Sequence, residues 1–294
     1  MKIVIIDSGL GGLSVCASLA DHLVQTNQRH PVEIKYVNAV PENDWGYNQM
    51  KTRKEKVETF NRVLYGIQQW YHPKLVFVAC HSLSALIDET PFAQQESLPL
   101  KGMIQMGTAS ILQHVSRHPA SGVLIFATET TIEEAIYPTQ LEAAGLETHR
   151  VVSQAFPGVA TLISNDRQGQ EVFQKIITFV RKALAQMAPP FEPIYAFLGC
   201  THYGYQRALF EKAFLESGDP QTILLNPNEE ASQHLIVQIP PDPNHDRLPL
   251  DLSIEFITRY ALPQNEVTTL SRYLSHSPHT VKALQNYTLK PDLF

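Results

Sequence analysis

The chain has 294 residues, of which 44% are hydrophobic and 18% are charged. This composition is typical of a soluble globular protein with one large or two medium domains, and it excludes the collagen, coiled-coil and disordered classes. With 23 Lys and Arg against 29 Asp and Glu, the formal net charge is -6. The chain therefore lacks the basic field that nucleic acid or an anionic membrane would require, and we expect neither as a partner.

The sequence also indicates the compartment. No stretch approaches the roughly 20 apolar residues that span a bilayer, and Asp7 cuts the apolar opening 1–6 below the signal-peptide core of about 7 to 15 residues. We therefore expect a cytoplasmic protein. Cys16, Cys80 and Cys200 are too few and too scattered for a disulfide framework or a structural zinc site, so we expect three free thiols.

Short apolar runs of strand length alternate with helical stretches along the chain. The expected strands are residues 2–6, 33–38, 75–79, 102–105, 122–127, 147–152, 194–198 and 222–225. Three intervening segments have the apolar spacing of amphipathic helices: 52–69, 168–186 and 206–216. This alternation predicts an α/β protein whose mostly parallel sheets are covered by helices on both faces.

The N-terminal segment 3–15 (IVIIDSGLGGLSV) joins a buried strand to an acid, a hydroxyl, three glycines and the start of a helix. Glycines let the backbone approach an anion, which the N-terminus of a helix favours. The segment is not a Walker A loop, and Ser14 at the third glycine position makes it a poor dinucleotide fingerprint. A simple helix cap is the competing interpretation for Asp7 and Ser8, but a carboxylate ending an apolar strand must be paired or lie in a cleft.

Two expected strands run into a cysteine in the same way. Residues 74–81 (KLVFVACH) and 193–202 (PIYAFLGCTH) each pass from an apolar run to a small residue, a cysteine and a nearby histidine. In a parallel sheet both thiols would lie at carboxyl ends, where open α/β sheets bind ligands. Ser82 is the expected N-cap of a helix over 83–88, whose dipole should lower the pKa of Cys80.

Two matched thiols suit either disulfide exchange or an acid and a base on opposite sides of a substrate. The absence of a CxxC spacing favours the second, and His202 is close enough in sequence to exchange a proton with Cys200. Zinc binding by both cysteines with His81 or His202 is a weaker alternative, because structural sites prefer four ligands. Inert burial is the competing interpretation for an isolated cysteine, and we expect it for Cys16.

Together, the segments DSGLGGLSV, VACHS and LGCTHY resemble, in order and spacing, the glutamate racemase family of the aspartate/glutamate racemase superfamily. FATETTIEEAIYPTQL and LLNPNEEASQHL resemble two further family segments, so the resemblance covers essentially the whole chain. It implies two pseudo-symmetric α/β domains with the active site in the cleft between them. The expected domains are residues 1–96 completed by 207–294, and residues 97–206, with the Pro-containing stretch 90–100 marking the first boundary.

The resemblance also implies two-base racemisation of an acidic amino acid with no pyridoxal phosphate, other cofactor or metal. A thiolate of one cysteine, Cys80 or Cys200, would remove the α-proton while the thiol of the other protonates the opposite face. Asp7 would assist Cys80, and His202 would assist Cys200. Substrate contacts are implied for Ser8, Trp45, Gly46, His81, Ser82 and Thr201.

The chain departs from the family pattern where the substrate is held. His81 and Ser82 stand where the family usually has Asn-Thr, and 45–47 (WGY) stands where it usually has Pro-Tyr-Gly. Phe156 replaces a frequent cysteine, and Ser164 lies near the place of an acidic residue. The loss of a helper carboxylate would slow catalysis or shift the preferred substrate.

L- and D-glutamate are the expected substrates, with the D-amino acid serving peptidoglycan biosynthesis in the cell wall. One alternative is a superfamily relative that racemises aspartate or another amino acid. Another is a hydrolase or decarboxylase that uses one cysteine, and a third is a non-catalytic relative that binds a ligand. The expected partner molecule is a small acidic amino acid, and self-association as a homodimer is left open.

Overall fold

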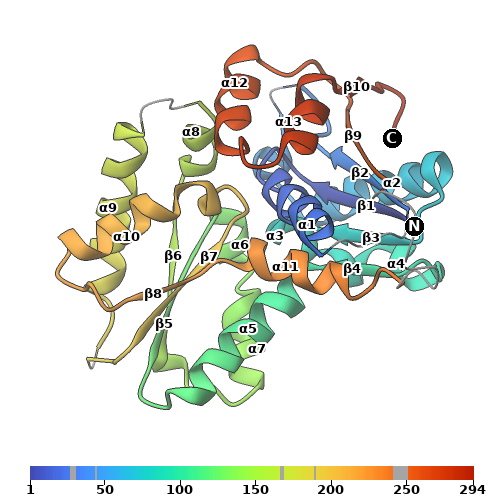
Figure 1. The fold of residues 1–294 in the computed structure, drawn as a ribbon. Coiled ribbons are helices and arrows are strands. Elements are labelled where there is room, and N and C mark those ends of the chain that lie inside the picture. Colours follow the sequence, from blue (N-terminus) through green and yellow to red (C-terminus); the bar gives the residue numbers. More distant parts are fainter. Residues whose placement is uncertain (27–30, 44, 166–168, 189, 241–250) are drawn as a thin grey trace. The chain divides into compact units, whose positions relative to one another are not determined.

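The computed structural model describes residues 1–26, 31–43, 45–165, 169–188, 190–240 and 251–294. The chain divides into two compact units, residues 1–102 with 228–294 and residues 103–227, each built on a parallel sheet (Figure 1). The predicted α/β class is confirmed. The boundaries expected at 96/97 and 206/207 lie earlier than these, because β4 (Leu100–Gly102) joins the first sheet and β8 (Ile223–Leu225) joins the second.

The sheet of the first unit has the strand order β10-β9-β2-β1-β3-β4, and all its neighbours run parallel. Besides β4, its strands are β1 (Lys2–Asp7), β2 (Val32–Asn38), β3 (Leu75–Val78), β9 (Leu252–Thr258) and β10 (Thr288–Leu289). Its helices are α1 (Leu13–Gln25), α2 (Arg53–Tyr71), α3 (His81–Ser84), α4 (Pro91–Gln95), α11 (Pro227–Ile236), which starts at the unit boundary, α12 (Gln264–Tyr273) and α13 (Pro278–Gln285), with short 3-10 helices at Tyr47–Gln49 and Ile87–Glu89.

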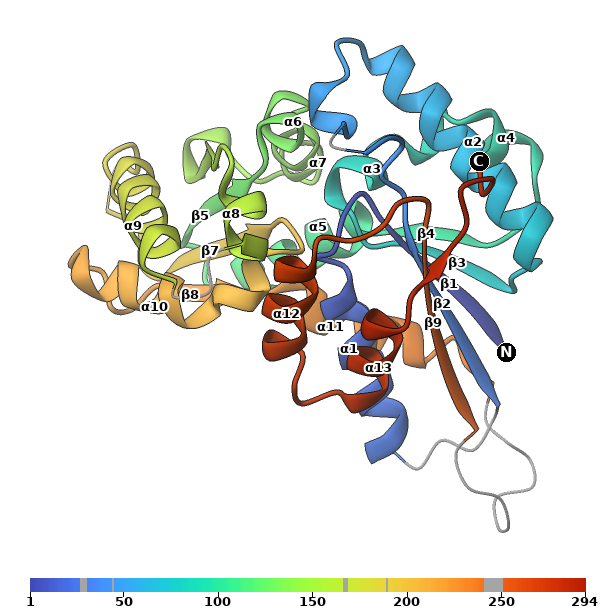
Figure 2. The ribbon, with the colours of Figure 1, turned by 90° about the horizontal axis from the view of Figure 1, so that it is seen from above.

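Helices cover this sheet on both faces (Figure 2). The apolar side of α2 packs on the face that β1 and β3 present with alternate residues, in one core formed by Val4, Ile6, Val76, Val78, Phe60, Val63, Leu64 and Ile67. On the other face, α13 packs against α1 and β9. Burial from both sides explains why β1 and β3 read as nearly continuous apolar runs.

The second unit has the strand order β6-β5-β7-β8, again all parallel. Besides β8, its strands are β5 (Gly122–Ala127), β6 (Val151–Ala155) and β7 (Ile194–Gly199). Its helices are α5 (Met103–Arg117), α6 (Glu129–Glu133), α7 (Ile136–Ala143), α8 (Val159–Asn165), α9 (Gln170–Leu184) and α10 (Arg207–Glu216), with short 3-10 helices at Thr148–Arg150 and Tyr203–Gln206. Figure 1 shows α5 and α7 on one side of this sheet and α9 and α10 on the other.

The two units share one connectivity over four strands, β2-β1-β3-β4 in the first and β6-β5-β7-β8 in the second. In each unit the chain adds its second strand on one side of the first strand and its third strand on the other side. The strand order therefore reverses between β1 and β3 and between β5 and β7, and such reversals are where open α/β sheets bind ligands. The expected pseudo-symmetry is confirmed at the level of strand order.

Several expected elements differ from the observed ones. Residues 102–105 are not a strand, because α5 begins at Met103, and a short apolar run fits a buried helix as well as a strand. The strand expected at 147–152 begins only at Val151. The helices expected at 52–69 and 206–216 are confirmed to within two residues. Residue 168 of the helix expected at 168–186 lies outside the described residues, and α9 covers 170–184.

Two expectations from composition can also be compared with the structure. All three cysteines are free, as predicted, and all three are buried, which was predicted only for Cys16. Across the described ranges, no helix is long and apolar enough to cross a bilayer.

Gly12 lets the start of α1 approach the ends of β1 and β3. A Cβ atom at this position would lie 2.8 Å from Asp7 Oδ2 and 3.0 Å from Ala79 Cβ, although its φ of -65° suits any residue. We expect Gly12→Ala to lower the free energy of unfolding in urea by about 1 to 3 kcal/mol through overpacking. Gln25→Ala, at the exposed end of the same helix, should change it by less than about 0.5 kcal/mol. Equal stability of the two variants would contradict the close packing at Gly12.

Candidate active-site residues

Asp7, Ser8 and Cys80 come together at the first reversal of strand order. Ile6 of β1 pairs with Val78 of β3, and the Ala79 amide donates to the Ile6 carbonyl at 2.8 Å. This register brings Cys80 level with Ser8, and the Ser8 Oγ and Cys80 Sγ atoms are 3.0 Å apart. Asp7 is 1% exposed and Cys80 is 7% exposed. The structure thus brings these three residues, which the sequence analysis named, together within the first unit.

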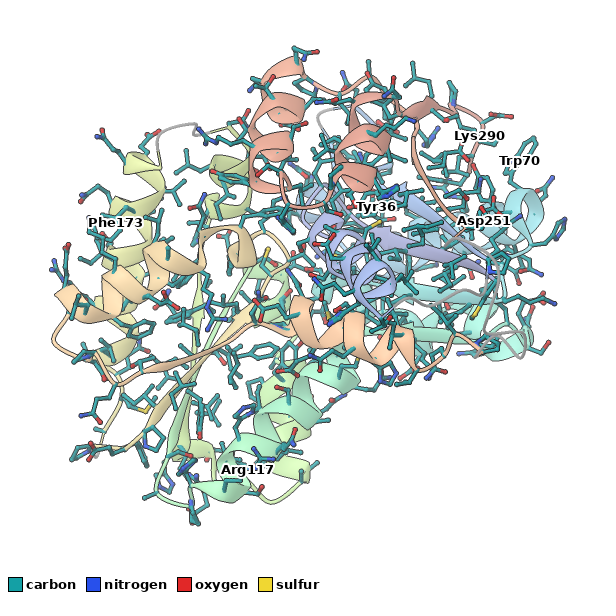
Figure 3. The ribbon with its side chains drawn as sticks, viewed as in Figure 1. Tyr36, Trp70, Arg117, Phe173, Asp251 and Lys290 are labelled. Carbon is teal, nitrogen blue, oxygen red and sulfur yellow. The ribbon has the colours of Figure 1, made fainter. Side chains whose placement is uncertain are left out.

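Hydrogen bonds from two sides fix the glycine loop that follows Asp7. The Tyr36 hydroxyl, on β2 (Figure 3), donates to the Gly9 carbonyl at 2.7 Å. Ser14 Oγ donates to the Gly11 carbonyl at 2.8 Å and accepts a hydrogen bond from Asn228 Nδ2, also at 2.8 Å. The loop is therefore held in place before any ligand binds.

Cys80 is held as a thiol rather than a thiolate. Burial raises the pKa of Cys80 to about 11, and the charge of Asp7 adds to this rise, whereas the hydrogen bond with Ser8 opposes it. The expected lowering of this pKa by a helix dipole is wrong. The helix that follows, α3, has only four residues, and Cys80 itself occupies its N-cap, so that Ser82 lies inside the helix and not at its cap.

His81 and Ser82 lie in α3 directly behind Cys80 and are 2% and 8% exposed. Burial lowers the pKa of the His81 imidazole to about 3. His81 is therefore neutral near pH 7, and any contact it makes with a substrate carboxylate is a hydrogen bond rather than an ion pair.

The loop with Trp45 and Gly46 leads into Tyr47, whose side chain lies in the same apolar core as Cys80. The Gly46 amide donates to Gln49 Oε1 at 2.9 Å, and Trp45 packs against the apolar core that includes Cys80. Burial raises the pKa of the Tyr47 hydroxyl above its usual range, and the charge of Cys80 raises it further. Sequence reasoning missed Tyr47 as a site residue, although it belongs to the segment that departs from the family pattern.

We call Asp7, Ser8, Tyr47 and Cys80 the Cys80 cluster. The hydroxyl of Tyr47 is buried and has no hydrogen-bond partner among the residues that the structure describes. A buried hydroxyl without a partner carries a desolvation cost, which a polar group of a bound ligand can relieve.

Cys200 occupies the equivalent place in the second unit. Ala127 of β5 pairs with Gly199 of β7, so Thr128 and Cys200 directly follow two paired strand ends. Cys200 is 7% exposed, and the neighbouring Thr201 is 3% exposed. By position in the two sheets, Thr128 corresponds to Ser8.

His202 lies next to the second thiol, with its Nδ1 atom 3.9 Å from Cys200 Sγ. Burial lowers the pKa of His202 to about 4. The imidazole is therefore neutral near pH 7 and able to accept a proton, which is the form that proton exchange with a thiol requires.

Tyr203 repeats in the second unit the arrangement of Tyr47 in the first. Its side chain is fully buried, and its hydroxyl has no hydrogen-bond partner among the described residues. Burial raises the pKa of this hydroxyl well above its usual range, and the charges of Cys200 and Glu129 raise it further. We call Glu129, Cys200, His202 and Tyr203 the Cys200 cluster.

No acidic side chain stands at Ser164, near the place where the family has an acidic residue. Ser164 is 4% exposed in α8, and Phe156 stacks on Phe210 with ring centroids 5.7 Å apart, so both belong to the core. Glu129, at the start of α6, supplies a negative charge that acts on Tyr203. Sequence reasoning missed Glu129, but its place two residues after the end of β5, next to the position that corresponds to Ser8, could have indicated it.

The zinc alternative gains no support. In the described part of the chain, no group of three or more His, Cys, Asp and Glu side chains is arranged to hold a metal ion. The chemistry that the two clusters offer is proton transfer by thiols, a carboxylate and a neutral imidazole.

Removing the charge of Asp7 should make Cys80 more reactive in the ligand-free protein. Asp7→Asn takes away a charge that raises the pKa of Cys80, so the thiolate fraction at pH 8 should increase, by about tenfold for each unit of pKa. The measurement is the rate of iodoacetamide alkylation at each cysteine, mapped by mass spectrometry.

Two controls accompany this measurement. Cys16 should stay unreactive in every variant, because burial raises its pKa to about 12. Asp21→Asn removes a charge from a partly buried position of α1, where Asp21 lies 3.7 Å from His276, and should leave the Cys80 rate unchanged. An equal or slower Cys80 rate in Asp7→Asn would contradict the electrostatic coupling.

Comparison with known proteins relates this arrangement to one family. No family model matches the chain. The glutamate racemase of Leptospira interrogans is 27% identical over 243 residues, which cover 82% of this chain and 84% of the relative. That of Lysinibacillus sphaericus is 27% identical over 205 residues, covering 68% of each chain.

Solved structures share the fold. Glutamate racemase isoform RacE1 from Bacillus anthracis superposes with a TM-score of 0.71 at 20% identity and covers 94% of both chains. The glutamate racemase of Francisella tularensis, solved in complex with D-glutamate, gives a TM-score of 0.68 at 18% identity over 93% of both chains. These structures confirm the fold, and the sequence relatives confirm the resemblance of this chain to glutamate racemases.

Proposed function

We propose that the chain is an amino-acid racemase, an isomerase that interconverts L- and D-glutamate by two-base catalysis with Cys80 and Cys200. The observation that carries this proposal is the matched placement of the two thiols, each at the reversal of strand order in one of two sheets with the same connectivity. The names of the sequence relatives support the reaction and the substrate. No cofactor takes part in the proposed mechanism.

The reaction needs one thiolate and one thiol. In the direction that begins at Cys80, its thiolate removes the α-proton, and the thiol of Cys200 donates a proton to the opposite face. Cys80 becomes a thiol and Cys200 a thiolate, so the protons balance. The reverse direction exchanges the two roles.

Substrate binding would favour the thiolate form of Cys80, which the first unit alone does not favour. Cys80 starts as a thiol with a pKa of about 11. The α-ammonium group of an amino acid would bring a positive charge that favours the thiolate, and Asp7 is the carboxylate next to Cys80 that can take up the thiol proton. In the second unit, the neutral imidazole of His202 can accept the proton of Cys200.

The carbanionic transition state needs fixed donors and the exclusion of water. We assign this role to hydroxyl and amide groups of the strand-end loops, including Ser8, Ser82 and Thr201. Trp45, Gly46 and His81 remain predicted substrate contacts. We place the reaction in the cytoplasm, where free thiols stay reduced. The D-glutamate formed there would enter peptidoglycan biosynthesis. Assembly of the chain as a homodimer stays a prediction.

A racemase for aspartate or another amino acid is the alternative function. The neutral, buried His81 and the loss of an acid at Ser164 favour it, because both changes fall where the family holds or activates its substrate. A hydrolase, a decarboxylase and a non-catalytic relative are separate outcomes of the same experiment.

The proposal is tested by proton NMR in deuterium oxide with single L- and D-amino acids and no added cofactor. We expect loss of the α-proton signal and formation of the opposite enantiomer with glutamate, faster than with aspartate. Faster turnover of aspartate would select the alternative substrate. Absence of exchange with every amino acid would contradict any racemase.

Cys80→Ala and Cys200→Ala should each abolish racemisation, because each removes the proton donor or acceptor on one face of the substrate. Either variant can still eliminate a leaving group from a β-substituted amino acid, since elimination needs the base on one face only. Cys16→Ala is the matched control and should retain activity. Full racemisation by either of the first two variants would sink the two-base mechanism.

His81→Asn should change KM or the preference between glutamate and aspartate without changing the pH profile. The imidazole has a pKa of about 3, so it does not titrate between pH 6 and pH 9. The measurement is kcat and KM for both amino acids across this range. A profile that shifts between the two proteins would show that His81 carries a charge in the working enzyme.

A further inference from the structure

A cavity lies in the first unit, and its lining contains no residue of the Cys80 cluster. Its volume is about 500 Å³, within the range of about 300 to 1,000 Å³ that is usual for small-molecule sites. One of its lining residues, Trp45, is also a predicted substrate contact. Its walls are formed by Pro41, Glu42, Asn43, Trp45, Arg62, Arg259, Tyr260 and Phe294.

Arg259 is fixed at this cavity before any ligand binds. Its Nε atom donates to the Pro291 carbonyl at 3.0 Å, and Nη1 donates to the Pro41 carbonyl. The guanidinium carbon lies 4.6 Å from the ring centroid of Phe294 and 5.4 Å from that of Tyr260. Because a guanidinium has five N–H donors, three remain for a ligand after these two hydrogen bonds.

Arg62 brings a second guanidinium to the same cavity. Its Nη2 atom donates to Thr59 Oγ1 at 3.2 Å. The ion pairs found among the described residues include neither Arg62 nor Arg259. Among the side chains of the described lining, two are cationic and one, that of Glu42, is acidic.

We infer that this cavity is a second binding site, for a small aromatic molecule that carries a carboxylate or phosphate group. Guanidinium groups bind such anions through paired N–H donors, and the rings of Trp45, Tyr260 and Phe294 supply flat apolar walls for an aromatic ring. The two features occur in one cavity of suitable volume, and together they select an anion with a ring over an inorganic ion.

The same cavity is linked to the Cys80 cluster through Arg62. The positive charge of Arg62 acts on the Tyr47 hydroxyl in opposition to the charge of Cys80. An anion bound to Arg62 would cancel this positive charge and so raise the pKa of the Tyr47 hydroxyl. This coupling concerns a residue of the site in the proposed function, but binding at the cavity does not require racemase activity.

Binding can be read from one tryptophan. The chain has two, Trp45 and Trp70. Trp70 is outside the cavity, with Lys290 Nζ 3.3 Å from its ring centroid (Figure 3). In the full chain with Trp70→Phe, titration with benzoate or phenyl phosphate should give a saturable change in Trp45 fluorescence. Acetate, inorganic phosphate and benzylamine, each lacking the ring or the negative charge, should give no saturable change.

Arg62→Gln should weaken the binding of both probes by about tenfold or more, the loss of one charge-assisted contact. Lys54→Gln, which removes an 85% exposed charge from the same helix, is the matched control and should bind like the parent. Arg259→Gln should also weaken binding, but it removes bonds that hold the loop, so Arg62 decides the question.

Three results would overturn the inference. Equal affinity of Arg62→Gln and its parent for benzoate would contradict the contact between Arg62 and the anion. A response to acetate equal to that to benzoate would contradict the role of the aromatic ring. Competition between benzoate and glutamate for the Trp45 signal would make the cavity a part of the substrate site.

Discussion

A buried carboxylate next to a buried thiol is the constraint on which the first unit depends. Asp7 is almost fully buried, and a charge in that position is costly unless polar groups surround it. The glycine loop meets this demand, because only a residue without a side chain at position 12 lets α1 come so close to the carboxylate. The hydroxyls of Tyr36 and Ser14 then fix the loop. Burial of the thiol, reinforced by the same charge, keeps Cys80 protonated until a ligand changes the local field.

The two units repeat a topology but not its chemistry. The position that Asp7 holds at the end of β1 is Ala127 at the end of β5, so the second thiol has no carboxylate in the equivalent place. A neutral imidazole two residues after Cys200 and a carboxylate at the start of α6 stand there instead. In the proposed mechanism, the two thiols would therefore exchange protons with different groups. A pair of bases serving two mirror-image substrates does not require identical surroundings.

Much of this arrangement could be predicted from local sequence. Continuous apolar runs indicated the buried strands, and the small residues and cysteines behind two of them indicated the strand ends. The strand predicted at 102–105 was wrong because a short apolar run fits a buried helix as well as a buried strand. Strand β9 was missed because its pairing with β2 joins residues about 220 positions apart. The protonation of Cys80 and His81 could not be predicted, since it depends on burial and on Asp7, which is distant in sequence.

The position of the second unit within the chain affects the order in which the protein can fold during synthesis. Residues 103–227 form their whole sheet from one continuous segment. The first unit cannot add β9 to β2 until the ribosome has made residues beyond 250, which leaves an unpaired edge on β2 in the meantime. A nascent chain therefore holds a finished inner domain while the outer one still exposes an incomplete sheet. This edge is where we would expect a chaperone to bind and where slow translation would favour aggregation.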